Sequence, residues 1–488
     1  MNANNKNIGW NFDNTYIKLP EIFLSQNFPT KVKNPKLLIL NSNLSKELGL
    51  NFEKLDDKET ASYLSGNLTP TGSQPFSQAY AGHQFGHFTM LGDGRATMIG
   101  EQIKPNNKRV DIQFKGSGKT KYSRNGDGRA ALSPMLREYI ISEAMYGLNI
   151  STTRSLAVVT TGENVMRENP LPGAILTRVA ESHIRVGTFQ YAAMQNDTKL
   201  LSELMHYTIN RHFPDIINLE NLAIELLKKV IQKQIKLISD WMRVGFIHGV
   251  MNTDNMTIAG ETIDYGPCAF IDAYDPTTVF SSIDFNGRYS FFNQPMIAHW
   301  NLSRFAETLL PLINNDEKKS LKIAEEIIND FSNQYKSHWL KIMRKKIGLN
   351  NEENEDEDII KDLFSIMEKN NYDYTNTFLF LMNNNSVDSN LYKDYLFIEW
   401  IKRWEKRKFK NHNKKDSLNL MYQNNPQVIP RNHIIENVLN LASEEYNLKP
   451  MNELIEILSD PYNKNFDKKE FQIPSKLGGK KYQTYCGT

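Results

Sequence analysis

The chain has 488 residues, of which 40% are hydrophobic and 23% are charged, and its formal net charge is +2. This length is enough for two or three lobes with a large buried core, and the composition is that of a globular protein. The nearly neutral charge argues against an extended nucleic-acid-binding surface. No apolar stretch is long enough for a membrane-spanning helix, and the start leads into no apolar signal region. We therefore expect a cytoplasmic protein without nucleic-acid or membrane partners.

The first strongly patterned segment begins after residue 86. Residues 87–91 are predicted as a strand, residues 92–95 (Gly-Asp-Gly-Arg) as a turn, and residues 96–103 as a returning strand. Residues 110–115 alternate apolar and polar side chains and end in Lys115, which is typical of a half-buried strand. This order is that of a protein kinase small lobe, although a glycine turn alone would indicate only a hairpin.

A helix is predicted to begin at Ser133 as the N-cap, with Pro134 in its first turn, and to continue to residue 148. Two of its carboxylates, Glu138 and Glu143, are candidates to hold Lys115 and aim it at phosphates, as the helix C glutamate does in kinases. Glu138 is the favoured candidate and Glu143 the competing one. Without the lysine strand upstream, two solvated surface charges would be the simpler interpretation.

The pentapeptide Gly-Asp-Gly-Arg-Ala occurs twice, at residues 92–96 and 126–130. Each copy offers flexible backbone N–H groups and a cation, which suit a phosphate chain. Two strands are predicted next, over residues 156–161 and 174–179. Arg178 lies on the second strand and Arg185 follows it. An isolated arginine usually forms a surface salt bridge, but several cations here converge on one inferred site, where arginine binds phosphate in a bidentate manner.

Residues 248–266 have the spacing of the catalytic loop and magnesium-binding motif of a protein kinase, with one substitution. The segment reads His-Gly-Val-Met-Asn-Thr-Asp-Asn, then a stretch predicted as a tight hairpin, then Asp-Tyr-Gly. In kinases, the aspartate two places after the histidine accepts the substrate proton, and the asparagine and the later aspartate hold magnesium. Here Val250 occupies the base position, Asn255 and Asp264 keep the metal pair, and Asp254 is a new carboxylate. This indicates a kinase-type nucleotide site with different chemistry.

The remaining pattern is mainly helical. A long amphipathic helix is predicted over residues 219–243, and further helices are predicted over residues 296–312, 318–339 and 356–369. We expect an α+β, protein-kinase-like fold of two lobes, with a small antiparallel-sheet N-lobe and a larger, mostly helical C-lobe. The expected division is an N-terminal extension (1–75), the N-lobe (76–190), the C-lobe (191–455) and a C-terminal tail (456–488).

These residues resemble the selenoprotein O family of kinase-fold proteins. The resemblance covers most of the chain and rests on Leu-Gly-Asp-Gly-Arg, Lys-Gly-Ser-Gly, Tyr-Ser-Arg-x-Gly-Asp-Gly-Arg-Ala, His-Gly-Val-Met-Asn-Thr-Asp-Asn-Met and Asp-Tyr-Gly-Pro. It implies ATP bound in an orientation flipped relative to kinases. It also implies transfer of AMP, or of UMP from UTP in some bacterial members, to Ser, Thr or Tyr hydroxyls of proteins, with Mg²⁺ or Mn²⁺ and release of pyrophosphate.

The resemblance also implies roles for individual residues. Glu138 would hold Lys115, Asp254 would accept the hydroxyl proton, and Asn255 and Asp264 would bind the metal ion. The implied nucleotide contacts are Gly92, Gly94, Arg95, Lys115, Asp127, Gly128, Arg178, Arg185 and Asp264.

Two other functions stay open. A protein or small-molecule phosphotransferase is permitted by the metal pair but disfavoured by Val250. A catalytically silent ATP-binding pseudokinase is permitted by the absent kinase base but disfavoured by the retained metal pair and Lys115.

The two cysteines, Cys268 and Cys486, are too few for a cysteine zinc site or a disulfide scaffold. In the family, a C-terminal cysteine or selenocysteine is thought to couple activity to redox state. The resemblance therefore implies a possible disulfide between Cys268 and Cys486. One buried cysteine and one exposed tail thiol is the alternative.

Overall fold

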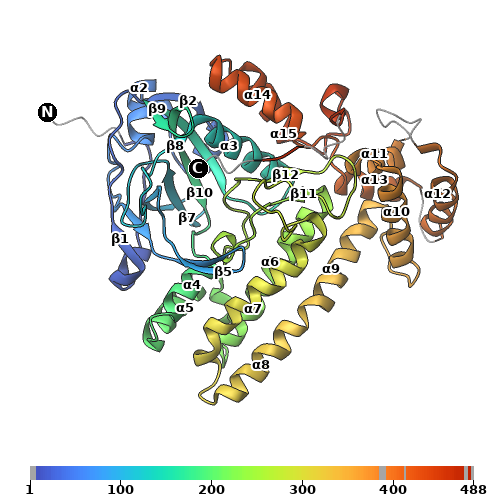
Figure 1. Ribbon diagram of the computed structural model, residues 1–488, viewed down its shortest axis with the longest axis horizontal. Coiled ribbons are helices and arrows are strands. Elements are labelled where there is room, and N and C mark those ends of the chain that lie inside the picture. The colour runs from blue at the N-terminus through green and yellow to red at the C-terminus, as the bar shows by residue number, and fades with distance from the viewer. Residues whose placement is uncertain (1–6, 384–391, 411–413, 477–481, 485–488) are drawn as a thin grey trace.

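The computed structural model describes residues 7–383, 392–410, 414–476 and 482–484. It has a mixed architecture in which an antiparallel sheet is followed along the chain by many helices (Figure 1). The sheet strands are β1 (Leu24–Gln26), β2 (Lys36–Leu40), β3 (Phe76–Gln78), β6 (Ala96–Ile103), β7 (Arg109–Lys115), β8 (Ala130–Ala131), β9 (Arg154–Met166) and β10 (Pro170–Ala180). Their order is β1-β3-β6-β7-β10-β9-β2, with β8 paired to β10. Segments before residue 76 therefore supply both edges of the sheet.

The strands predicted at residues 96–103, 110–115, 156–161 and 174–179 are confirmed as β6, β7, β9 and β10. The hairpin predicted across the first glycine loop is wrong. β5 (His87–Met90) pairs with β4 (Ala81–Gln84) in a separate two-stranded sheet, because both edges of β6 are already occupied by β3 and β7. The loop is tied to β3 instead, since the Asp93 N–H donates to the Gln78 carbonyl. It thus carries the chain from one sheet to the other.

Helix α3 (Leu132–Gly147) packs against β9 and β10. Its N-cap is Ala131, whose side chain makes no capping hydrogen bond, so the prediction of Ser133 as the N-cap is wrong. Leu132 is only 1% exposed. Burial of this first apolar side chain, rather than a polar cap, therefore determines where the helix begins.

The helical part begins after β10. Its elements are α4 (Val186–Ala193), α5 (Thr198–His212), α6 (Leu222–Val244), α7 (Gln294–Ile313), α8 (Glu317–Asn329), α9 (Phe331–Lys346), α10 (Asp356–Asn370), α11 (Tyr374–Asn383), α12 (Tyr395–Lys408), α13 (Lys414–Asn424), α14 (Asn432–Glu444) and α15 (Lys449–Ser459). Two short helices, α1 (Ser42–Glu47) and α2 (Asp57–Leu64), precede the central strands. Helices α6, α7 and α10 confirm the predictions. The single helix predicted over residues 318–339 is wrong, because Asp330 separates α8 from α9.

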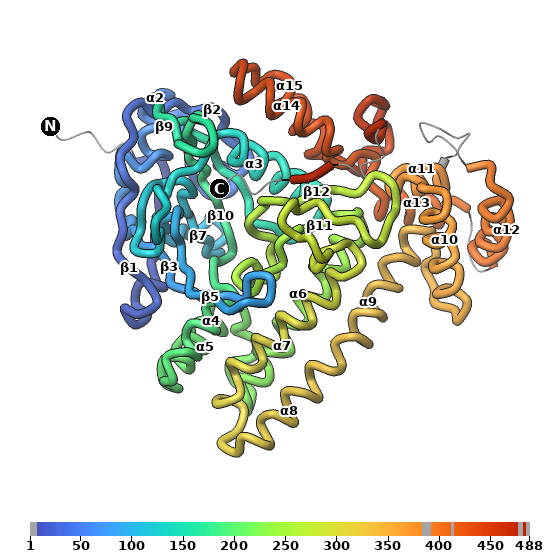
Figure 2. The backbone as a smooth tube through the Cα atoms, viewed as in Figure 1, coloured from blue at the N-terminus to red at the C-terminus, as the bar shows by residue number. Residues whose placement is uncertain are grey.

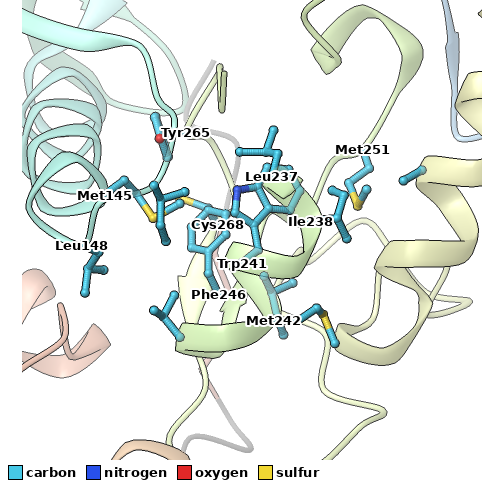
Figure 3. Close-up of a cluster of buried hydrophobic side chains, with 14 of the residues drawn as sticks. Met145, Leu148, Leu237, Ile238, Trp241, Met242, Phe246, Met251, Tyr265 and Cys268 are labelled. Carbon is cyan, nitrogen blue, oxygen red and sulfur yellow. The ribbon is translucent and has the colours of Figure 1, made fainter. Parts of the chain in front are cut away.

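Segments that are distant in sequence close around α3. Figure 2 shows α14 and α15, near the end of the chain, running beside α3, and both helices contact it. On its other side lies the main apolar core, where Trp241 and Phe246 pack with Met145 and Cys268 (Figure 3). The two-residue strands β11 (Phe246–Ile247) and β12 (Ala269–Phe270) pair within this core. Within the described residues, no helix combines the length and apolar character needed to cross a bilayer.

Candidate nucleotide site

A cavity of about 770 Å³ lies between the sheet and the helical part. Its volume is within the range of small-molecule binding sites. All the residues predicted to contact the nucleotide or the metal ion line it, together with the predicted lysine partner Glu138 and the predicted proton acceptor Asp254. The set is Gly92, Gly94, Arg95, Lys115, Asp127, Gly128, Glu138, Arg178, Arg185, Asp254, Asn255 and Asp264. The fold therefore brings these residues to one place, while their roles stay predictions.

Three cations and two carboxylates form a connected network at the base of the cavity. Lys115 Nζ lies 2.6 Å from Glu138 Oε2 and 2.8 Å from Asp264 Oδ1. Arg178 Nη2 is 2.6 Å from both Glu138 Oε1 and Asp264 Oδ1. Arg185 Nη1 is 3.1 Å from Asp264 Oδ2. A third carboxylate, Asp93, lies farther away, with its Oδ1 3.9 Å from Arg185 Nη2. The three clustered cations suit a polyphosphate.

The two carboxylates of this network remain ionised despite their burial. Burial alone would raise the pKa of Glu138, but Arg178 and Lys115 outweigh it and hold that pKa below its ordinary value. The pKa of Asp264 is held well below its ordinary value because Arg178, Lys115 and Arg185 together outweigh the same burial effect. Asp264 therefore offers a negative charge at neutral pH.

Glu143, the competing candidate, does not contact Lys115. Its carboxylate accepts hydrogen bonds from Arg154 Nε at 2.9 Å and Arg154 Nη2 at 2.7 Å, and from the side chain of Asn41. It therefore links α3 to β9 and the N-terminal segment. Glu138, and not Glu143, is the carboxylate of α3 that lies beside Lys115. Neither carboxylate is a solvated surface charge, so that interpretation is wrong.

We expect Glu143→Gln to lower the free energy of unfolding by about 2 kcal/mol, because it breaks a largely buried ion pair. Chemical denaturation measures this effect. Nucleotide affinity should stay unchanged, because the Glu143 carboxylate does not face the cavity. A Glu143→Gln variant of normal stability would contradict the role of Glu143 in linking α3 to β9.

The first copy of the repeated pentapeptide packs against residues 120–123, which precede the second copy. The Ser123 hydroxyl donates to the Gly94 carbonyl, and the Thr120 hydroxyl donates to the Asp93 carbonyl at 2.6 Å. A Cβ atom on Gly92 would lie 2.4 Å from the Tyr122 ring. Glycine is therefore required there for the loops to pack. Asp127 in the second copy is exposed, and Arg167 Nη1 donates to its carboxylate at 2.9 Å.

Asp254 has a different environment from the other carboxylates. It is 6% exposed, and its Oδ1 has no hydrogen-bond partner within the described part of the chain. Its Oδ2 lies 3.5 Å from Gln84 Nε2. Burial raises the pKa of Asp254 to about 6. A carboxylate without an ion-pair partner and with a pKa near neutrality suits a proton acceptor.

Strand β4 holds Asp254 in position. The His83 N–H donates to the Thr253 hydroxyl at 2.7 Å, and that hydroxyl donates to the Gln190 side-chain carbonyl at 2.6 Å. A Cβ atom on Gly82 would lie only 2.3 Å from Asp254 Oδ1. The sequence did not indicate these contacts, because β4 and α4 are distant from residue 254 and carry no recognised motif.

We expect Gly82→Ala to reduce the transfer rate by about tenfold to a hundredfold, because the added methyl group must displace the Asp254 carboxylate. Steady-state kinetics with labelled nucleotide measures the loss. Gly72→Ala is a control for the steric effect, since a Cβ atom there meets nothing closer than 3.8 Å. Its φ of 83°, unlike the backbone at Gly82, is left-handed, so this control should cost stability without changing the rate. An unchanged rate in Gly82→Ala would show that the carboxylate position is not important.

The segment between Asn255 and Asp264 is not the predicted tight hairpin. Thr257 and Thr262 each form an isolated bridge to another segment, to Arg185 and Thr152 respectively. Bridges to neighbouring segments therefore hold residues 255–264 in place, and the segment does not form a two-stranded ladder with itself. The Asn255 side-chain N–H donates to the Val250 carbonyl at 3.0 Å, so the amide oxygen is the atom available to the predicted metal ion.

A family model described as "Protein adenylyltransferase SelO" matches residues 6–459 of the chain. The chain belongs to the SelO family. Curated relatives named "Protein nucleotidyltransferase YdiU" share this family. The SelO-family chain is 57% identical to the protein of Brevibacillus brevis over 98% of both chains. It is 54% identical to the protein of Nitrosococcus oceani over 99% of this chain and 98% of the relative. It is also 54% identical to the protein of Pelagibacter ubique over 99% of this chain and 100% of the relative.

The possible disulfide of this SelO-family chain stays a prediction. Cys268 is buried in the apolar core beside Met145 and Trp241 (Figure 3). Cys486 lies outside the described residues. The described end of the tail nevertheless reaches the cavity: Gln483 and Thr484 line it, and the Thr484 hydroxyl donates to the Pro267 carbonyl at 2.8 Å.

Proposed function

We propose that this protein nucleotidyltransferase moves AMP, or UMP, from a nucleoside triphosphate to a Ser, Thr or Tyr hydroxyl of an acceptor protein. The observation that carries the proposal is the environment of Asp254. It is a buried carboxylate without an ion-pair partner in the described chain, beside a valine at the kinase base position. The relatives' printed name, protein nucleotidyltransferase, supports the same reaction class.

In the proposed reaction, the acceptor oxygen forms a bond to the α-phosphorus as Asp254 takes the hydroxyl proton. The bond from the α-phosphorus to the bridging oxygen breaks, and pyrophosphate leaves. Lys115, Arg178 and Arg185 supply positive charge for the leaving group, which carries more charge than the ADP released by a kinase. Because Glu138 and Asp264 already hold these side chains in place, the side chains need to move little to stabilise the leaving group.

We also propose that Asn255 and Asp264 hold Mg²⁺ or Mn²⁺. One amide oxygen and one ionised carboxylate fit a cation that completes its shell with phosphates and water. Within the described residues, His, Cys, Asp and Glu side chains do not gather in groups of three or more that would hold a metal ion. In this proposal, phosphate oxygens and water complete the shell. When bound, the ion would neutralise phosphate charge.

The finer architecture is part of the same proposal. We propose a kinase-like pair of lobes, with the division at residues 76, 191 and 456 and with the nucleotide between the lobes. The pairing of Lys115 on β7 with Glu138 on α3 supports this, because kinases use the same strand-to-helix pair.

ATP labelled separately on the α- and γ-phosphate tests the function. Transfer of the α-label to protein, with release of pyrophosphate, is the expected result. Transfer of the γ-label would establish a phosphotransferase instead. Nucleotide binding without either transfer would favour a silent pseudokinase.

A further inference from the structure

Exposed apolar side chains lie on β5, which runs into the cavity-lining Leu91, and on the segments on either side of Tyr289. Phe88 and Met90 on β5 are 41% and 44% exposed, Met296 on α7 is 63% exposed, and Phe285 is 90% exposed. Isolated exposed apolar residues are common, but a group of large ones near a functional site indicates an interaction surface. We call this the entrance surface, and define it as Phe88, Met90, Phe285, Arg288, Met296 and Trp300.

Ring contacts join the two sides of the entrance surface. The His83 ring lies 5.1 Å from the Phe88 ring and 5.2 Å from the Trp300 ring. The Arg288 guanidinium carbon is 4.8 Å from the centre of the Trp300 ring. Met296 lies one helical turn before Trp300 and so shares its face of α7. The β4–β5 hairpin and α7 therefore present one continuous surface.

This surface is fixed to the Asp254 loop at Asn252. The Phe85 N–H donates to Asn252 Oδ1 at 3.1 Å, and the Tyr289 hydroxyl donates to the same oxygen at 2.6 Å. Asn252 and Gln84 both line the cavity. A chain bound on the entrance surface would therefore pass beside the Asp254 carboxylate.

The charge on this surface is positive. Arg288 is its charged member, and the ion pairs of the described residues include none for Arg288 or for the neighbouring Arg124, whose Nη2 donates to the Met90 carbonyl. Arg304, whose guanidinium carbon lies 5.1 Å from the centre of the Trp300 ring, is paired with Glu307. The surface therefore complements a segment that carries both acidic and apolar side chains. We propose that the entrance surface binds the segment of the acceptor protein that flanks the modified hydroxyl, and that this segment is acidic and apolar. This inference rests on the proposed function.

The test uses two synthetic peptides with one serine each, one flanked by Glu and Phe and the other with Lys in place of Glu. With α-labelled ATP, the wild-type full chain should modify the acidic peptide with the higher kcat/KM. Arg288→Glu should lower that kcat/KM by about fivefold or more and reduce the preference. Phe285→Ser should raise the KM for the acidic peptide by a similar factor. ATP affinity should stay unchanged in both variants, which shows that they fold.

Matched controls lie outside the entrance surface. Arg403→Glu on α12 and Phe28→Ser, which is 65% exposed in the wild type, should leave peptide kinetics unchanged. Equal use of both peptides by the wild type, or a preference that survives Arg288→Glu, would overturn the inference while leaving the transfer activity intact. A self-associating wild type that Phe285→Ser makes monomeric, with unchanged peptide kinetics, would also overturn it, since a second copy would then cover the surface. Failure of the wild type to label any protein or peptide would instead reject the proposed function.

Discussion

Asp264→Asn should abolish nucleotidyl transfer, with a loss of about a thousandfold or more. The substitution removes the carboxylate that contacts Lys115, Arg178 and Arg185 and that is proposed to bind the metal ion, and such charge stabilisation contributes several kcal/mol to a barrier. Asparagine is the informative replacement because Asp264 has a φ of 62°, which asparagine tolerates better than alanine does. Transfer of the α-label measures the loss.

The same substitution should lower the free energy of unfolding by roughly 3 kcal/mol, since Lys115 and Arg178 would keep only Glu138, and Arg185 would keep only the more distant Asp93. Asp215→Asn is the matched control, because Asp215 is an exposed partner of Lys229. It should change neither quantity appreciably. If Asp264→Asn lost stability but kept transfer, the carboxylate would serve only to neutralise the neighbouring cations in the folded protein and would have no part in the reaction.

Asp254→Asn should lower the transfer rate by about a hundredfold to ten-thousandfold, the usual contribution of a positioned proton acceptor. It should leave ATP affinity nearly unchanged, because Asp254 forms no ion pair with the cations that line the cavity. The pH profile gives the sharper result. The acceptor acts in its ionised form and burial raises its pKa to about 6, so the wild-type rate should rise with pH through about 6.

The residual rate of Asp254→Asn should not rise with pH in this range. Dividing the wild-type rate by the variant rate at each pH removes any pH dependence that comes from titration of the nucleotide itself. Gln84→Ala should move the rise to higher pH, because the Gln84 amide stabilises the charged carboxylate. A profile that is the same in wild type and Asp254→Asn would mean that another group accepts the proton.

The sequence predicted the parts of the site that depend on local patterns. Lys115 ends an alternating strand, Glu138 lies early on the following helix, and Asn255 and Asp264 belong to contiguous motifs, so pattern and spacing were enough to assign them. The contacts around Asp254 could not be predicted. Gly82, Gln84 and Gln190 reach it from segments 64 to 172 residues away, and only the tertiary fold brings them there.

The errors in the fold prediction have a similar cause. The chain does fold back after the glycine loop, but strand pairing depends on which sheet edges are already filled, and β3 occupies the edge of β6 that a local hairpin would have used. Likewise, residues 255–264 have a plausible turn sequence, but bridges to Arg185 and Thr152 determine their path. Local propensity identifies elements more reliably than it identifies their partners.

The anchoring of Thr484 has a practical consequence for protein engineering. Its amide donates to the Phe280 carbonyl at 2.8 Å, and its carbonyl accepts from Ser282 at 3.1 Å, at the wall of the nucleotide cavity. A bulky fluorescent label attached beside Thr484 would compete with this anchor for space. A label is better attached at Asn7, which is exposed on the sheet side of the molecule and does not line the cavity.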